Sequence, residues 1–421
     1  MTILMVGSGG REHALIRKLK ESPRVTRILC APGNGGASRD AECFPVPATD
    51  LPGMLKLAQR EDVDLVFVAP DDPLALGMVD LMQKNGIRAF GPSKAAARIE
   101  ASKVFSKRLM EKYSIPTAEY AVFEVTADAL AYIRAQGTFP SVIKADGLAL
   151  GKGVVIAQDL AEAKAALRAI LEEGKFGQSG RRVVVEEFLT GPEVSVLAFT
   201  DGKTLVHMIS SMDHKRALDG DKGLNTGGMG TVAPNPHYTP EIAAECMEKI
   251  FLPTLRAMQA EGCPFAGCLY FGLILTPNGP KVIEYNARFG DPETQVVLPL
   301  LDTPLADIVD AVVDSRLADI DIKWKNAHAA CVVLASGGYP EAYEKGKVIS
   351  GLDADGQADN AEVFHAGTAY EDGRFVTNGG RVLGVTGMGG TLAQALERAY
   401  SAVEGIAFEG VHYRRDIGAK C

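Results

Sequence analysis

The sequence predicts a multidomain protein that combines α/β and α+β parts. Three observations support this fold class: strand and helix patterns follow each other near the N-terminus, a glycine-rich hairpin pattern occupies the middle, and short strands with tight turns end the chain. A length of 421 residues suits roughly two to four domains. We expect a doubly wound parallel sheet over 1–101, a central domain over 102–326 with a mobile glycine-rich lid at about 118–190, and a small α+β domain over 327–421.

The composition indicates a globular protein that acts on small molecules. Hydrophobic residues make up 47% and charged residues 23%, which are ordinary values for a soluble protein. The net charge of −9 argues against a nucleic-acid-binding surface, so we expect small anions as partners. We expect no signal peptide and no membrane span. The seven cysteines are scattered without a C-x-x-C pair, which predicts reduced thiols in a cytoplasmic protein.

The first element is a strand at 3–6, followed by a glycine turn at 7–10 and a helical pattern through Leu19. Backbone N–H groups at such a helix N-terminus can hold an anion. The turn lacks the third glycine of a dinucleotide fingerprint, since Glu12 stands there, and the next strand, 27–30, does not end in an acid. A phosphate or phospho-sugar is therefore favoured over NAD, with an unliganded turn as the alternative.

Two further strands, 64–68 and 88–90, complete the first sheet, and a long helix is expected from Lys94 to Tyr113. Lys103 and Lys107 share one face of that helix. Either they bind a ligand together or they are simply solvated.

Residues 140–156 predict two strands around a glycine-rich tip, with Lys144 in the first strand and Lys152 at the tip. This is not a P-loop, because Gly153 follows the lysine where Ser or Thr should stand, and a strand follows instead of a helix. We interpret it as a hairpin that folds down on phosphates. The alternative is a flexible hairpin with a solvated lysine.

The next strand, 182–189, runs into a loop whose backbone could bond an adenine edge, while Glu193 could accept from ribose hydroxyls. Further on, residues 220–230 hold five glycines, too many for a routine connection, so a loop that closes on a ligand is expected. Disorder is the alternative for this loop.

Residues 281–286 alternate like a strand, which places Glu284 and Asn286 on one face. A carboxylate beside an amide oxygen suits Mg²⁺, which takes few protein ligands and fills its other positions with phosphate oxygens and water. Arg288 can serve as a fork for phosphate or carboxylate. The alternative is a polar strand edge. The turn at 289–293 adds two more acids and lowers the weight of that alternative.

The last part of the chain follows a helical segment that ends near Leu317 and a polar link at 321–326. Short strands begin at His328, and a helix is expected over 392–403. No catalytic constellation is visible in this part.

Taken together, these motifs resemble the ATP-grasp fold and, more narrowly, the phosphoribosylamine–glycine ligase family. The resemblance covers essentially the whole length. It rests on five segments: 7–14, 144–154, 213–216, 225–230 and 287–293.

The resemblance implies a reaction of purine synthesis in which ATP and Mg²⁺ couple glycine to 5-phosphoribosylamine, with Mn²⁺ as an alternative ion. The glycine carboxylate would attack the γ-phosphorus to give glycyl phosphate, and the amine of the phospho-sugar would then displace phosphate. Catalysis would consist mainly of positioning and charge neutralisation, with no Ser, Cys or His nucleophile. We expect a monomer or weak homodimer.

The resemblance also implies roles for single residues. Catalytic roles fall to Arg288, Asp213 and Lys144, and glycine would be held by Asp213 and Arg288. ATP would be bound by Lys103, Lys144, Gly151, Lys152, Gly153, Glu186, Glu187, Phe188, Leu189 and Glu193. The phospho-sugar would face Gly9, Gly10, Arg11, Asn34 and Asp291. Mg²⁺ would be held by Glu284 and Asn286.

Four positions depart from the family pattern. Asp71 stands where Glu is usual, Met212 replaces a Gln, Pro192 replaces a Glu, and Leu224 replaces a Pro. Asp71 puts the details of sugar binding in doubt. Two other functions stay open: a different ATP-grasp carboxylate–amine ligase or carboxylase, and a nucleotide-binding sensor without turnover. The segments 213–216 and 227–230 favour the glycine ligase over the other ligases.

Overall fold

The N-terminal part of the computed structural model, which describes residues 1–149 and 153–421, is a five-stranded parallel sheet. Its strand order is β3-β2-β1-β4-β5. The strands are β1 (Thr2–Gly7), β2 (Arg27–Pro32), β3 (Glu42–Cys43), β4 (Leu65–Val68) and β5 (Arg88–Phe90). Because the chain winds outward from β1 in both directions, the crevice beyond the ends of β1 and β4 is the expected ligand position. The predicted doubly wound sheet is confirmed.

Both faces of this sheet are covered, as parallel sheets require. Helix α1 (Gly10–Lys20) covers one face, and α3 (Leu51–Arg60) and α5 (Met78–Lys84) cover the other. Alternate residues of β1 therefore enter different cores. Short helices α2 (Ala37–Asp40) and α4 (Asp71–Leu76) follow β2 and β4.

The predicted helix from Lys94 to Tyr113 is wrong, since the structure has two helices there. α6 (Lys94–Ala101) ends before Ser102, and α7 (Lys103–Lys112) begins after it. Ser102 is extended, with φ −141° and ψ 109°, and its hydroxyl accepts from the Phe105 N–H. A serine that caps the following helix competes with helix continuation. The break places Lys103 in the first turn of α7.

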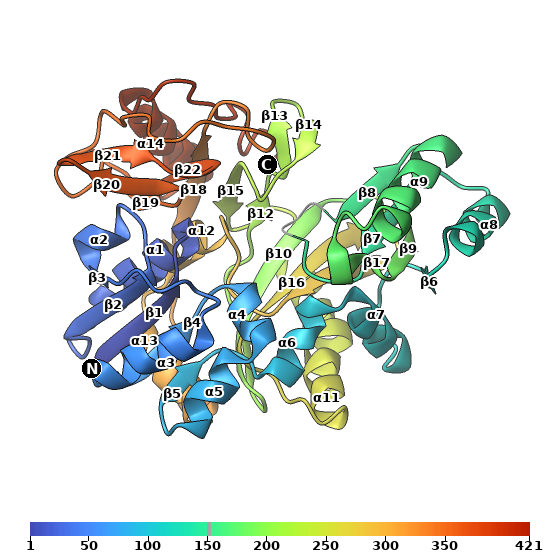
Figure 1. Cartoon of the computed structure of the whole chain (residues 1–421), viewed down its shortest axis with the longest axis horizontal. Coiled ribbons are helices and arrows are strands. Elements are labelled where there is room, and N and C mark those ends of the chain that lie inside the picture. The colour runs from blue at the N-terminus through green and yellow to red at the C-terminus, as the bar shows by residue number, and fades with distance from the viewer. Residues whose placement is uncertain (150–152) are drawn as a thin grey trace.

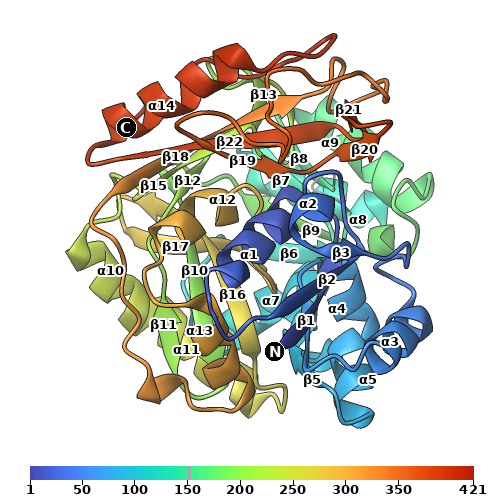
Figure 2. The same cartoon turned by 90° about the vertical axis from the view of Figure 1, so that its left-hand side faces the viewer.

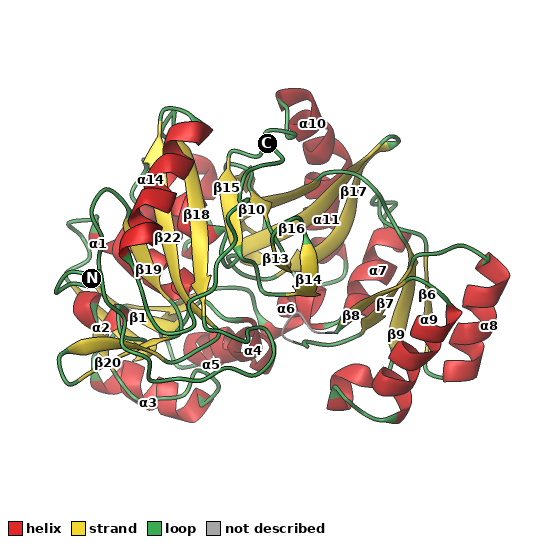
Figure 3. Cartoon of the chain, turned by 90° about the horizontal axis from the view of Figure 1, so that it is seen from above, coloured by secondary structure: helices red, strands yellow, loops and turns green. Residues whose placement is uncertain are grey.

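The lid is a separate four-stranded antiparallel sheet that stands apart from the other layers (Figures 1 and 3). Its order is β6-β9-β7-β8, from β6 (Tyr120–Phe123), β7 (Ser141–Ala145), β8 (Val154–Ala157) and β9 (Val183–Glu187). Helices α8 (Thr126–Gln136) and α9 (Leu160–Leu167) bury their apolar faces against it. The predicted hairpin is confirmed, but Gly151 and Lys152 at its tip lie outside the described residues.

The central sheet has the order β11-β10-β16-β17 and is antiparallel. Its strands are β10 (Glu193–Asp201), β11 (Leu205–His207), β16 (Ala266–Thr276) and β17 (Gly279–Asn286). Helix α11 (Leu252–Ala260), which follows α10 (Pro240–Cys246), packs on one face, and α13 (Leu305–Val313) packs on the other. The chain reaches α13 through α12 (Thr294–Val297).

The C-terminal sheet has the order β12-β15-β18-β22-β19. It consists of β12 (Met212–Asp213), β15 (Gly230–Ala233), β18 (His328–Ala335), β19 (Glu362–His365) and β22 (Arg381–Gly389), with α14 (Leu392–Gly405) across one face (Figure 2). β15 pairs with β18, so the pairing crosses the predicted boundary at 326 and ties the end of the glycine-rich loop to this sheet. The loop itself contains a hairpin, β13 (Arg216–Leu218) and β14 (Lys222–Asn225), and a second hairpin joins β20 (Thr368–Glu371) to β21 (Arg374–Thr377).

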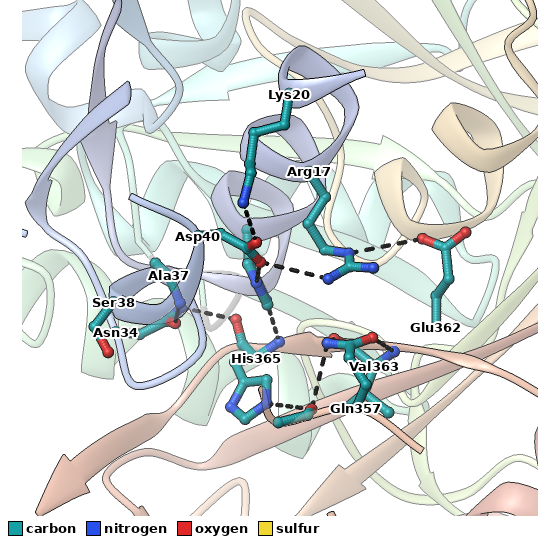
Figure 4. Close-up of polar contacts among 12 residues, drawn as sticks. Arg17, Lys20, Asn34, Ala37, Ser38, Asp40, Gln357, Glu362, Val363 and His365 are labelled. Atoms are coloured by element: carbon teal, nitrogen blue, oxygen red, sulfur yellow. Dashed lines mark hydrogen bonds and ion pairs between the residues drawn. The ribbon is translucent and has the colours of Figure 1, made fainter. Parts of the chain in front are cut away.

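A buried polar cluster joins the N-terminal and C-terminal sheets (Figure 4). His13 Nδ1 accepts from the His365 backbone N–H at 2.8 Å, so Nε2 carries the proton and donates to Asp40 at 3.0 Å. Burial lowers the pKa of His13. The Asn34 amide donates to the carbonyl of His365 at 2.7 Å. These bonds fix the β1–α1 turn against the C-terminal sheet.

Within the described ranges, no helix has the length and apolar character that crossing a bilayer demands.

Candidate active site

Lys144 and Glu186 form the centre of a buried charge cluster in the lid sheet. Lys144 lies on β7 and donates to Glu186 Oε2 at 3.0 Å and to the Ile283 carbonyl at 3.2 Å. Lys107 Nζ lies 3.2 Å from the same carboxylate oxygen, and burial lowers the pKa of Lys107 to about 8. Glu186 Oε1 is buried and has no hydrogen-bond partner among the residues the structure describes. One carboxylate atom is therefore left over for a ligand.

Lys103 lies in the first turn of α7 and donates to the Gly147 carbonyl at 3.2 Å. Burial lowers its pKa, and the lysine is held near Glu284 and Lys144. Gly153 follows the undescribed tip, and a Cβ there would lie 2.7 Å from that of Ala149. The structure thus brings together the two lysines predicted for the phosphates beside the glycine hairpin.

The residues predicted around adenine and ribose lie at the exit of β9. The Glu187 carboxylate accepts from the Glu119 N–H and from Lys281, both at 3.0 Å, so it braces the strand exit. Phe188 is 39% exposed and Leu189 is half-buried, as residues awaiting a planar ligand would be. Glu193 is paired with Lys215 at 2.7 Å.

Glu284 and Asn286 are half-buried on the face of β17 opposite the buried ring of Tyr285. A bulge at Ile283 lets Val282 and Tyr285 enter the same core although three positions separate them. Burial acts to raise the pKa of Glu284, but the ammonium groups of Lys215, Lys144 and Lys103 outweigh it, and the pKa is lowered.

The carboxylate of Glu284 is therefore ionised, and no hydrogen bond or ion pair within the described part of the chain engages it. Over the same part, no group of three or more His, Cys, Asp or Glu side chains could hold a metal ion. One carboxylate and one amide fit an ion that takes its remaining ligands from nucleotide phosphates and water.

Arg288 follows this strand and is held by Glu100 of α6. Its Nη2 lies 2.9 Å from Glu100 Oε1, and the same nitrogen donates to Asn286 Oδ1 at 3.4 Å. Arg288 Nε is buried without a partner among the described residues. Burial raises the pKa of Glu100 to about 7. The free N–H marks a place for an anionic ligand.

Asp213 is the third site residue with an unused atom, after Glu186 and Arg288, because its Oδ1 is buried and unpartnered among the described residues. Burial and the nearby Glu293 raise its pKa well above the ordinary value. Gly228, at φ +113°, packs against it, and a Cβ there would lie 2.6 Å from Asp213 Oδ1. A ligand ammonium at this position would favour the ionised carboxylate.

Arg381 of β22 is a site residue that sequence reasoning missed. Its Nη1 donates to the carbonyls of Gly227 at 2.6 Å and Asp291 at 2.8 Å, and its Nη2 lies 3.3 Å from Asp291 Oδ1. It clamps the glycine-rich loop to the Asp-Pro turn from the C-terminal sheet. Ninety residues separate it from Asp291, and neither spacing nor periodicity marks such a contact.

The residues predicted for the phospho-sugar lie together at the end of β1. The Arg11 backbone N–H donates to Asp291 Oδ2 at 3.2 Å, and a Cβ on Gly9 would come within 3.3 Å of that oxygen. The Arg11 guanidinium points inward, to Glu12 Oε1 at 2.6 Å and the Phe289 carbonyl at 3.1 Å.

The Asn34 amide is also engaged, by the Ser8 carbonyl at 2.9 Å and the Gly9 carbonyl at 3.4 Å. A Cβ on Gly10 would lie 2.7 Å from Gln295 Nε2. The structure therefore brings these residues together, but the side chains of Arg11 and Asn34 shape the turn. Their contact with a sugar stays a prediction.

Three family models match the chain in sequence. They are described as the N domain (residues 1–100), the ATP-grasp (A) domain (101–294) and the C domain (329–420) of phosphoribosylglycinamide synthetase. Curated relatives named phosphoribosylamine–glycine ligase include proteins of Caldanaerobacter subterraneus, 46% identical over 100% of both chains, and of Nostoc sp., 50% identical over 99% of both.

Solved structures give the same result. A crystal structure of phosphoribosylamine–glycine ligase from Thermotoga maritima is 37% identical, with a TM-score of 0.86, over 99% of this chain and 100% of the other. A biotin carboxylase domain from Hydrogenobacter thermophilus is 16% identical, with a TM-score of 0.73, over 98% and 91%. This second likeness is one of fold alone. The predicted resemblance, fold class and ligase class are confirmed. The chain belongs to the phosphoribosylamine–glycine ligase family of ATP-grasp enzymes.

Proposed function

We propose that the protein joins glycine to 5-phosphoribosylamine at the expense of ATP, forming glycinamide ribonucleotide, ADP and phosphate. The observation that carries this proposal is the ionised Glu284 carboxylate, which no described residue engages and whose pKa is lowered by Lys215, Lys144 and Lys103, together with the buried side chains of Arg288 and Asp213. Each of the last two has a buried polar atom without a partner in the described part of the chain. Buried unsatisfied groups are costly, so their convergence favours a ligand that supplies partners.

The proposal places the ATP phosphates between Lys103 and Lys144, under the glycine hairpin. Glu284 and Asn286 would hold Mg²⁺, with Mn²⁺ as an alternative ion, which when bound neutralises charge on the phosphates. The chain's own contribution is positional. The Lys144 ammonium is oriented by two acceptors, the Glu186 carboxylate and the Ile283 carbonyl. An ammonium held at two points gives a fixed charge for the transferred phosphoryl group.

Glycine would lie between Asp213 and Arg288. Its ammonium would pair with the Asp213 carboxylate and so act against the burial that raises the pKa of that carboxyl. Its carboxylate would accept from the free Nε–H of Arg288, which Glu100 holds in place. This orientation directs the carboxylate oxygen toward the γ-phosphorus, to form glycyl phosphate and ADP.

The acceptor, 5-phosphoribosylamine, would bind at the turn between β1 and α1. At the N-terminus of α1 the N–H groups of Gly9 and Arg11 donate to Glu12 and Asp291, so the sugar phosphate would bind to the remaining backbone N–H groups of the turn. The amine would attack the carbonyl carbon of glycyl phosphate, and phosphate would leave as the amide forms. We extend the proposal to a cytoplasmic enzyme that acts as a monomer or weak homodimer, with the domain limits given above.

Glycine labelled with heavy oxygen in its carboxylate tests the acyl phosphate step. We expect one labelled oxygen to appear in the released phosphate for each amide formed, measured by mass spectrometry. Unlabelled phosphate accompanied by product would overturn the glycyl phosphate route. A variant with Asp213→Asn should transfer no label, because it cannot pair with the glycine ammonium.

A further inference from the structure

Two cysteines outside the proposed reaction lie next to each other at the edge of the N-terminal sheet. Cys30 of β2 and Cys43 of β3 are register partners in adjacent parallel strands. Such strands are about 4.8 Å apart, within the Cα separation of roughly 4.4–6.8 Å that disulfides span. A Cβ on Gly33 would clash with Cys43 Sγ and lie 3.5 Å from Cys30 Sγ, so both sulfurs face one point.

The two thiols differ in reactivity. Cys30 is fully buried and Cys43 is half-buried. The adjacent Cys43 thiol raises the pKa of Cys30, and burial adds to that effect. The adjacent Cys30 thiol lowers the pKa of Cys43, and the Asn34 N–H reinforces this against burial. Because the thiolate is the reactive form, Cys43 is the thiol that reacts first with an oxidant.

The pair is also connected to the proposed acceptor site. Cys30 Sγ lies 3.5 Å from the Gly7 carbonyl oxygen, and the Gly33 N–H donates to the same oxygen at 3.0 Å. The Asn34 N–H lowers the pKa of Cys43, and the side-chain amide of the same residue donates to the Ser8 carbonyl at 2.9 Å. The segment 33–34 thus touches the thiols on one side and the glycine turn on the other.

We propose that Cys30 and Cys43 are an oxidation site, which a hydroperoxide converts into a disulfide that weakens binding of the phosphorylated acceptor. The second half rests on the proposed function of the glycine turn. β3 has only two residues and lies at the sheet edge, so Cys43 can move toward Cys30 without breaking a central strand. That movement would shift the Gly33–Asn34 turn and, through it, the backbone of the acceptor site.

The reaction balances with one hydroperoxide per pair. The Cys43 thiolate attacks a peroxide oxygen, the O–O bond breaks, and Cys43 becomes a sulfenic acid as water or alcohol leaves. Cys30 sulfur then attacks Cys43 sulfur, the S–O bond breaks, and water leaves. The two thiols lose two electrons and two protons, and the peroxide is reduced by those electrons.

The full-length protein with Cys421→Ser, which removes the exposed thiol, is treated with hydrogen peroxide and digested with trypsin. Trypsin cuts after Arg39, so the two cysteines fall on separate peptides, 28–39 and 40–56. We expect a cross-linked pair that dithiothreitol separates. Oxidised protein without this pair, or with Cys43 joined to another cysteine, would overturn the proposal.

Steady-state kinetics test whether the disulfide weakens binding of the phosphorylated acceptor. We expect oxidation to raise the acceptor KM by about tenfold, as a small displacement of a binding turn does, with the ATP KM unchanged. Cys43→Ser should abolish both the cross-link and the effect, and the buried Cys263→Ser should retain both. A cross-link with unchanged acceptor KM would refute the coupling to the acceptor site. If the reduced enzyme makes no product at all, the proposed function fails while the cross-link remains measurable.

Discussion

Replacing Glu284 with glutamine tests the metal-binding half of the site with little disturbance of the fold. Glutamine keeps the size of the side chain, and only burial and charge effects act on the Glu284 carboxylate, which has no hydrogen bond from the described residues to lose. We therefore expect the free energy of unfolding to change by no more than about 1 kcal/mol.

The catalytic effect should be much larger. Glu284 is the only carboxylate of the two predicted metal ligands, and Asn286 alone cannot neutralise a divalent ion. We expect kcat to fall by about 10²–10³-fold, equivalent to roughly 3–4 kcal/mol in the barrier. ATP without Mg²⁺ should bind as well as before or better, because the lost carboxylate repels phosphates while the three nearby lysines remain.

The assay is a pair of titrations. Calorimetry gives the ATP Kd with and without Mg²⁺, and coupled ADP release gives kcat as a function of Mg²⁺. We expect the gain in affinity from Mg²⁺ to vanish in Glu284→Gln and to persist in Glu397→Gln, a matched change at an exposed glutamate of α14 outside the site. Near-normal turnover of Glu284→Gln at ordinary Mg²⁺ would refute the assigned metal role.

Four other predictions address stability and substrate binding. Glu186→Gln leaves two buried lysines without their shared carboxylate, so urea denaturation should show a loss of about 3–5 kcal/mol, and a loss below 1 kcal/mol would refute the pairing. The pKa of Glu100 is raised by burial to about 7, so its stabilising contribution is full below pH 4.5 and is lost as pH rises through 7; Glu100→Gln should remove this slope from the unfolding free energy. Arg11→Ala should raise the acceptor KM far more than the ATP KM, and equal increases in both KM values would contradict the predicted site. The loss of the ion pair with Glu12 should also lower the Tm. Arg381→Lys breaks the fork between the glycine-rich loop and the Asp-Pro turn, so the glycine KM should rise while ATP binding stays constant, and an unchanged glycine KM would count against the clamp.

Local signals were sufficient for the elements that carry the site. The strand at 3–6 and its glycine turn, the hairpin around the lid tip and the polar face of β17 all follow from period-two patterns and glycine positions. They also placed Lys144, Glu284 and Asn286 on strands that the structure confirms.

The remaining features depend on contacts between distant residues. The sequence pattern does not reveal whether a serine inside it caps a new helix. Ser102 caps α7, and its hydroxyl also donates to Asp146 of the lid at 2.8 Å. The bulge at Ile283 is invisible to a strict alternation, although its carbonyl helps to hold Lys144. The Arg11 guanidinium bonds to its neighbour Glu12, a contact that only the packed turn decides, and its role at the phospho-sugar stays a prediction.

The most direct test of the account is ADP release from purified protein with Mg-ATP. Three conditions are compared: glycine alone, 5-phosphoribosylamine generated in place alone, and both together. The account predicts sustained release only with both substrates, in step with glycinamide ribonucleotide detected by mass. Bound ATP without release in the presence of both substrates would contradict it, and would leave the ATP-grasp site with a different acceptor or with no turnover.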